Sequence, residues 1–376
     1  AVAAVAGTAI VASLGVAWLG WASRSEAPAP CQATDRHLAG RWDTALASEL
    51  RGAFTATGLP YAAATAARVI ERLDGWSHAW QDMRVEACEA THVHGEQSDA
   101  MLDQRMRCLD RRLDELASLA SLLTRADRDT VEHAARAVSE LPALEPCADP
   151  EALAAAIPPP ADPAVKVRVD ELRHDLAVAA AHLRAAQYQE GRALASTAVA
   201  AGAGLGYLPL RGEALLLRGA LESDDGDHKR AEATFREALH VTAEEHDDHG
   251  AARALVDLMA ALTDQARGAE ALTLSIAADA AVIRVGDRRL EGDLLSQVGR
   301  AHERQGDFAR AAEQLAAALA IHEEALGPGP RSDRGLAAGP RRPAVGPRGS
   351  PPAGLRASAT AWAGQRSGHR ATPRAQ

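Results

Sequence analysis

The second half of the chain repeats itself every forty residues. Small, apolar and turn-forming residues recur at the same offsets in two segments that lie 80 residues apart, 219 to 299. In the first segment they are Gly219, Gly226, Asp227, Ala231, Phe235 and Ala238, and in the second they are Gly299, Gly306, Asp307, Ala311, Leu315 and Ala318. Weaker copies complete about four units between Val165 and Leu326. Such a period indicates stacked supersecondary units rather than a closed globular fold.

Each unit is predicted to be a helix, a tight turn and a second helix. Gly-Asp supplies the turn, because glycine tolerates a positive φ and aspartate caps the following helix. Gly219 on the first helix is expected to face Ala231 on the second, so that the two backbones approach closely. Phe235 is expected to fill the seam, and Ala238 to pack on the following unit. The corresponding residues of the last unit are Gly299, Ala311, Leu315 and Ala318.

Composition supports a helical fold. Only 3% of the residues are aromatic, and alanine supplies much of the 47% hydrophobic content. Small side chains suit closely packed helices, whereas sheets draw on β-branched and aromatic residues. We therefore expect an all-α protein. The formal net charge of −10 argues against a nucleic-acid binder, which needs clustered Lys and Arg.

The last 50 residues, 327–376, differ in composition from the rest. They contain nine Arg, nine Gly, eight Pro and one acidic residue, a net charge of +8, so the other 326 residues carry −18. No helical or strand period is present, and we expect a disordered tail. The abrupt loss of the period after Leu326 favours a frame-shifted remnant, with a basic arm for an acidic surface as the alternative.

The first 23 residues contain no charged side chain. A helix of this length is about 35 Å long, enough to cross a hydrocarbon core of about 30 Å. Trp18 and Trp21 lie at one end, where indole rings favour the headgroup region. We therefore expect a transmembrane helix at 1–23 and a linker at 24–30, with a signal peptide as the alternative. Because the chain begins at Ala1 rather than Met, we expect it to be a fragment or a processed chain.

Residues 31–160 are expected to form a helical region that carries all four cysteines. The even number fits two disulfides in an oxidising compartment. Cys88 and Cys108 lie near the facing ends of two predicted helices, which suits one bridge across a helical hairpin. Cys31 and Cys147 bracket the region and would form the other bridge.

Three other sets of residues invite a functional interpretation. One is a metal site of Cys88, His92, His94 and Cys108. Its spacing matches no standard zinc pattern, and no base can be named for a thiol nucleophile. Gly202-Ala-Gly204-Leu-Gly206 has the form of a phosphate loop, but no strand precedes it. The acidic segments 224–227 and 244–249 could attract a cation, but both fall at predicted turns. We therefore predict no catalytic, metal or cofactor-binding residue.

The repeat resembles the tetratricopeptide repeat in its longer form, of about 40–42 residues rather than the basic 34. Two units depart from the pattern. The first has Gly191 where the second helix of the other units has alanine, and the third has Ala266-Arg267 instead of Gly-Asp. The resemblance implies an α-solenoid over 163–326.

A second resemblance extends over Ala1 to about Leu326. It rests on Trp42-Asp43, Phe54, residues 80–84, 88–91, 95–98 and 105–109, Leu141-Pro142, and Cys147-Ala-Asp149 before the 158–160 prolines. These segments are similar to the part that follows the membrane span in a family of bacterial Hanks-type serine/threonine protein kinases. The resemblance implies a cytoplasmic kinase domain before the span, and a cysteine-bearing helical region and tetratricopeptide repeats outside the cytoplasm. The chain itself has no Gly-rich loop, no His-Arg-Asp and no Asp-Phe-Gly, so we expect no enzyme activity from it.

The sequence therefore favours a non-catalytic, membrane-anchored interaction or sensor module with residues 24 onward outside the cytoplasm. A stand-alone scaffold, an enzyme using the Cys/His clusters and a transcriptional regulator are the alternatives. The expected partner is a protein or peptide in the concave groove of the first helices, or a second copy of the chain. The candidate groove residues are Arg211, Glu213, Arg218, Asp293, Gln297 and Arg300. Arg218 and Arg300 are not expected to be buried.

Overall fold

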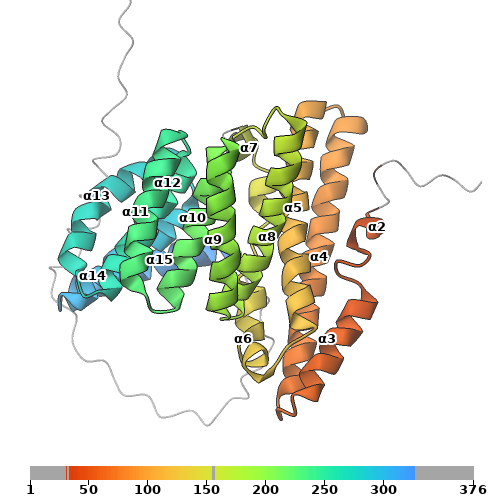
Figure 1. Cartoon of the computed structure of the whole chain (residues 1–376), viewed down its shortest axis with the longest axis horizontal. Coiled ribbons are helices and arrows are strands. Elements are labelled where there is room, and N and C mark those ends of the chain that lie inside the picture. Colours follow the sequence, from red (N-terminus) through yellow and green to blue (C-terminus); the bar gives the residue numbers. More distant parts are fainter. Residues whose placement is uncertain (1–30, 32–33, 155–156, 327–376) are drawn as a thin grey trace, which may run out of the picture. The chain divides into compact units, whose positions relative to one another are not determined.

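A computed structural model describes residue 31, residues 34–154 and residues 157–326. This part of the chain is helical and contains no strand, which confirms the all-α class (Figure 1). The first region comprises α2 (Asp35–Leu38), α3 (Thr44–Ala56), α4 (Ala62–His92), α5 (Asp99–Leu123), α6 (Arg128–Ser139), η1 (Glu145–Cys147) and α7 (Pro150–Ala154). The repeats comprise α8 (Pro163–Arg184), α9 (Tyr188–Leu205), α10 (Leu208–Asp224), α11 (His228–Glu244), α12 (Asp248–Asp264), α13 (Gly268–Val285), α14 (Arg288–Arg304) and α15 (Phe308–Leu326).

Three of the sequence predictions fall outside the described residues. They are the transmembrane helix at 1–23, the linker at 24–30 and the tail at 327–376. Among the helices that the structure describes, none combines the length and the apolar character needed to cross a bilayer.

The eight helices from α8 to α15 form four consecutive helix pairs, as the forty-residue period predicts. The second pair shows how the turn is built. Gly226 has a φ of 85°, and the Asp227 side chain accepts a hydrogen bond from the Arg230 amide at 3.2 Å, which caps α11. In the third pair Ala266 takes the positive φ of 61° that glycine takes elsewhere. The backbone turn is thus kept where the Gly-Asp sequence is lost.

The close approach within a pair is made differently from our prediction. A Cβ built on Gly219 would lie 2.5 Å from Cε1 of Phe235, and one built on Gly299 would lie 2.8 Å from Cγ of Leu315. The glycine therefore makes room for the large residue of the second helix. The expected partner of Gly219, Ala231, is not among its three nearest neighbours, whereas the carbonyl oxygen of Ala311, the expected partner of Gly299, lies 3.3 Å from the added Cβ. Phe235 is 2% exposed because α12 packs against α11.

The predicted cysteine pairing is wrong, although two disulfides are present. Cys31 is bonded to Cys88, and Cys108 to Cys147, with Cα–Cα distances of 5.6 and 5.5 Å. The register of the α4–α5 hairpin explains why Cys88 and Cys108 do not meet. The Trp80 indole donates to the Leu109 carbonyl at 2.8 Å, so position 80 of α4 lies opposite position 109 of α5. Because the two helices run in opposite directions, position 88 then lies opposite about position 101. Cys108 is about seven residues further along α5, or about 10 Å at 1.5 Å per residue.

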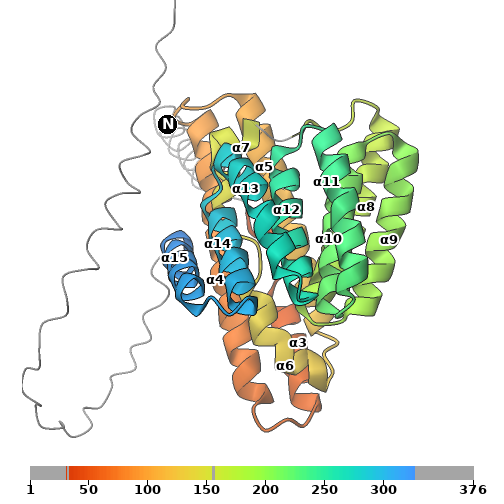
Figure 2. The ribbon, with the colours of Figure 1, turned by 90° about the vertical axis from the view of Figure 1, so that its left-hand side faces the viewer.

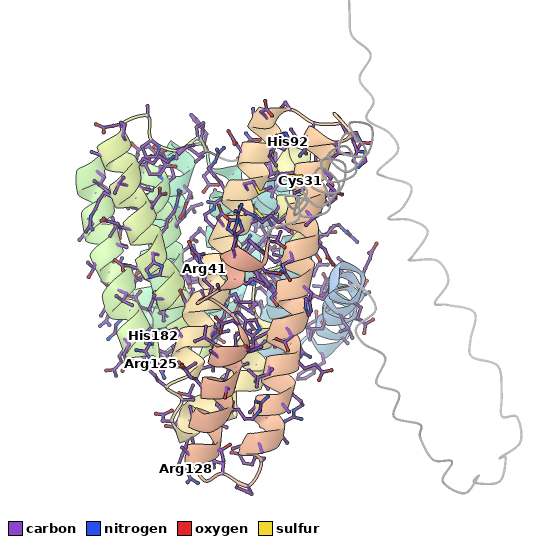
Figure 3. The ribbon with its side chains drawn as sticks, turned by 90° about the vertical axis from the view of Figure 1, so that its right-hand side faces the viewer. Cys31, Arg41, His92, Arg125, Arg128 and His182 are labelled. Atoms are coloured by element: carbon purple, nitrogen blue, oxygen red, sulfur yellow. A yellow bond between two sulfur atoms is a disulfide. The ribbon has the colours of Figure 1, made fainter. Side chains whose placement is uncertain are left out.

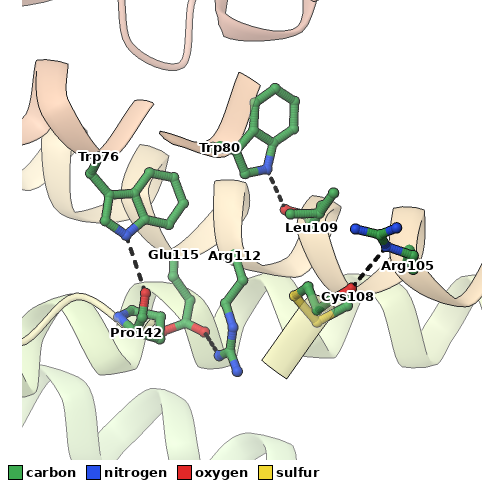
Figure 4. The surroundings of a disulfide bond; sticks show 9 residues. Trp76, Trp80, Arg105, Cys108, Leu109, Arg112, Glu115 and Pro142 are labelled. Carbon is green, nitrogen blue, oxygen red and sulfur yellow. Dashed lines mark hydrogen bonds and ion pairs between the residues drawn. A yellow bond between two sulfur atoms is a disulfide. The ribbon is translucent and has the colours of Figure 1, made fainter. Parts of the chain in front are cut away.

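The second disulfide lies inside a network that closes the first core (Figure 4). The Trp76 indole donates to the Pro142 carbonyl at 3.1 Å. Arg105 is 5% exposed, donates to the Cys147 carbonyl at 3.3 Å and forms an ion pair with Glu86. The segment after α6 is therefore fixed to α4 and α5 by side-chain hydrogen bonds as well as by the covalent bond.

The first disulfide fixes the start of the described chain to α4. Figure 3 shows Cys31 beside one end of this helix, close to His92, which is one turn beyond Cys88. Gln81 of α4 also donates to Asp35 at 2.6 Å. Cys31 and Asp35 are thus each fixed to α4.

The described parts of the cysteine region and of the repeats belong to one compact unit. Helix α8 connects them, because α5 and α6 pack against it. Ala181 and Ala185, at the end of α8, belong to the same apolar core as Trp80 and Leu113. The first helix of the repeats is therefore also a wall of the cysteine region.

Candidate functional site

The first helices of the pairs, α8, α10, α12 and α14, form the inner side of the stack. Each packs against the next one, whereas consecutive second helices show no comparable packing in the described part (Figures 1 and 2). Shorter spacing on one side of a solenoid makes that side concave. The inner side is the surface on which we expected a partner.

A row of charged residues with the period of the repeat follows this inner side. Positions 173, 213, 253 and 293 hold Arg, Glu, Arg and Asp. The Arg173 guanidinium donates two hydrogen bonds to the Glu213 carboxylate, at 2.7 and 3.1 Å. Arg253 forms an ion pair with Asp293 at 3.2 Å. The side chains are 18–45% exposed, so the row is open to solvent although each charge is paired. We call these four residues the inner row.

Two acidic groups near the end of the row differ in their protonation behaviour. Burial raises the pKa of Asp293, and the charges of Arg253 and His322 oppose this rise. A hydrogen bond from His249 and the Leu290 and Arg289 amides lower the pKa of Asp287 to about 2, against the effect of burial. Asp287 is the N-cap of α14, so its charge stabilises the start of that helix.

The predicted groove residues do not form one surface. Glu213 and Asp293 belong to the inner row. Arg211 and Arg218 reach across to Glu237 of α11, at 2.7 and 3.3 Å. The Arg218 side chain is 20% exposed, so it is not buried, as expected, but it lies between α10 and α11 rather than on the open face.

The remaining two groove residues lie on α14. Arg300 is not part of the inner row. Its guanidinium group contacts Asp264 of α12 at 2.5 Å and Gln297 at 3.1 Å. Its side chain is 39% exposed. Both residues therefore lie where the ends of two first helices meet.

A polar pocket of about 410 Å³ lies between α9, α10 and α11. It is lined by Arg192, Ser196, Arg218, Glu222, Arg230, Ala233, Thr234 and Glu237. Glu222 is 3% exposed, and its Oε2 accepts a hydrogen bond from the Thr234 hydroxyl at 2.6 Å. This pocket combines a buried carboxylate with three guanidinium groups from three helices.

The other sets of residues noted in the sequence have structural roles. All four cysteines are in disulfides, and the described residues contain no group of three or more side chains placed to hold a metal ion. Gly202 lies inside α9 against the backbone of Arg211, and Gly206 ends the helix with a φ of 63°. In the acidic segments, Asp227 and Asp247 cap α11 and α12.

No family model, no curated protein and no solved structure matches this chain.

Sequence reasoning found Glu213 and Asp293 but missed Arg173, Arg253 and Glu222. The signal for the first two was present, because alignment at the forty-residue period places them in one column with Glu213 and Asp293. Glu222 resembles a solvent-exposed residue on a polar helix face, and only the packing of α11 buries it.

Proposed function

We propose that the chain is a non-catalytic protein-interaction module that lies outside the cytoplasm. Two observations support this proposal. The repeats form a curved stack of helix pairs, an architecture that commonly presents an extended binding surface. The two disulfides are typical of proteins in an oxidising compartment.

The module is proposed to be anchored in the inner membrane by residues 1–23 and to be the extracytoplasmic part of a receptor-like serine/threonine kinase with a tetratricopeptide-type solenoid. The assignment to a receptor-like kinase and to tetratricopeptide repeats rests on the resemblance of the sequence to these families. A reporter enzyme that is active only outside the cytoplasm, fused after Leu326 in the full-length protein, tests the placement. Activity of the reporter agrees with the proposal. An inactive fusion contradicts it when the same reporter is active on a control protein known to be exported.

The proposed binding surface for a partner is the inner row. Its charges alternate along the stack and remain partly exposed, so they can orient a protein segment without performing chemistry on it. The proposed partner is a protein or peptide with complementary alternating charges.

A charge swap tests this surface while keeping opposite charges at the two positions. Arg253→Glu combined with Asp293→Arg reverses the order of the charges on the inner side. It also removes the ion pair of Arg253 with Asp257 at 2.9 Å, so circular dichroism must first show that the variant keeps its helicity. The matched control is the swap Asp248→Arg with Arg284→Glu, an exposed pair between α12 and α13. Partners cross-linked in the native envelope should be lost with the first swap and kept with the second. Recovery of the same partners with both swaps would show that the inner row does not bind them.

A further inference from the structure

The second repeat has three polar residues at positions that are apolar in the third. Arg218, Glu222 and Thr234 lie together between α10 and α11. Forty residues later the same positions hold Leu258, Leu262 and Leu274. Glu222 is 3% exposed and Leu262 is 1% exposed, so this position is buried in both repeats. Since leucines suffice to pack the next helix pair, packing alone does not require a carboxylate here.

Protein groups satisfy the buried carboxylate only in part. The Thr234 hydroxyl donates to Oε2 of Glu222, but the nearest cation to Oε1 is Nε of Arg218, at 3.8 Å. That Nε atom is itself buried and has no hydrogen-bond partner. A buried charge costs free energy unless hydrogen bonds compensate it. The floor of the pocket thus offers a carboxylate oxygen engaged in a long ion pair, and a buried N–H donor without a hydrogen-bond partner.

The rim of the pocket adds two guanidinium groups with donors to spare. Arg192 of α9 contacts Asp225 at 3.3 Å, and Arg230 of α11 contacts Asp227 at 3.2 Å. An arginine has five N–H donors, so each of these contacts leaves several donors for another acceptor. The rim therefore favours a carboxylate, whereas Glu222 favours an ammonium group.

We infer that this pocket binds a free α-amino acid, whose ammonium group donates to Glu222 and whose carboxylate accepts from Arg218 and the rim arginines. The lining holds two carboxylates, Glu222 and Glu237, and three guanidinium groups, so a zwitterion meets opposite charge at both ends, which a simple anion or a simple cation does not. A volume of about 410 Å³ is within the usual range of small-molecule sites. The site does not depend on the inner row, because its walls come from α9 and α11.

Isothermal titration calorimetry of the oxidised protein tests the inference directly. The twenty amino acids are titrated, with acetate and methylamine as probes that carry one charge each. At least one amino acid should bind, and both single-charge probes should bind at least about tenfold more weakly, because each loses one set of charge-assisted hydrogen bonds.

Three variants assign the heat of binding to the pocket. The triple variant Arg218→Leu, Glu222→Leu and Thr234→Leu copies the third repeat and should keep its helicity while losing binding. Glu222→Gln should weaken binding by about 10- to 100-fold. Arg236→Met removes an arginine that is 53% exposed and paired with Glu232 outside the pocket, and it should bind as the native protein does.

Two results would overturn the inference. One is that no amino acid binds to the native protein, or that acetate or methylamine binds as tightly. The other is that binding persists in the triple variant. If circular dichroism shows that the triple variant is unfolded, the affinity of Glu222→Gln becomes the deciding measurement. An affinity equal to that of the native protein then overturns the inference.

Discussion

Replacing Gly219 by alanine sets two effects of opposite sign against each other. Alanine is favoured over glycine inside a helix by about 1 kcal/mol. The new Cβ would lie 2.5–2.9 Å from three atoms of the Phe235 ring, however, and this ring is 2% exposed and cannot move toward solvent freely. Overpacking of a core costs about 1–3 kcal/mol. We expect the packing effect to be the larger one, so that Gly219→Ala lowers the free energy of unfolding by up to about 2 kcal/mol.

Gly75→Ala is the matched control, because Gly75 lies inside α4 with no heavy atom within 4 Å of its added Cβ. Only the helix preference applies there, and the protein should become more stable by about 1 kcal/mol. Urea denaturation of the oxidised protein, followed by circular dichroism, measures both changes. The two substitutions should have opposite signs.

A double-mutant cycle isolates the contact with the ring. In a Phe235→Ala background the space next to Gly219 is free, so Gly219→Ala should become stabilising by about 1 kcal/mol, like the control. If Gly219→Ala already stabilises the native protein as much as Gly75→Ala does, the close approach of α10 to the Phe235 ring is not a feature of the folded protein.

Three further predictions follow from the disulfides and caps. Peptide mapping of non-reduced protein should recover Cys31 linked to Cys88 and Cys108 linked to Cys147, and recovery of Cys88 linked to Cys108 would contradict the hairpin register. Replacing both Cys108 and Cys147 by serine should lower the free energy of unfolding by about 4 kcal/mol for a loop of 39 residues, measured by urea denaturation. The folded-state pKa of Asp287 is about 2, below its unfolded value, so its contribution to stability is full above about pH 4 and is lost as the pH falls toward 2. Asp287→Asn should therefore flatten the acid limb of the stability profile between pH 4 and 2, and an unchanged limb would contradict this assignment.

The sequence was sufficient for the repeats but not for the contacts between distant helices. The helix pairs from α8 to α15 were predictable because turn-forming and small residues recur at a fixed period, and each unit is built from local signals. The disulfide pairing was not predictable, because it depends on the register of two long helices. In the observed register Cys108 lies about seven residues, or about 10 Å, beyond the position opposite Cys88. Glu222 was not recognised for a similar reason, since a polar residue on a helix face is buried or exposed according to what packs on it.

The bond between Cys31 and Cys88 also determines how the protein responds to mechanical force. A pull on the chain that precedes residue 31 is transmitted through the disulfide to the last two turns of α4, and it bypasses α2, α3 and most of α4. The chain between these cysteines, with a sequence separation of 57 and an extended length of about 190–200 Å, cannot lengthen while the bond is intact. Tension from a membrane anchor would therefore act between α4 and the repeats, and reduction of one covalent bond would add this length to the tether.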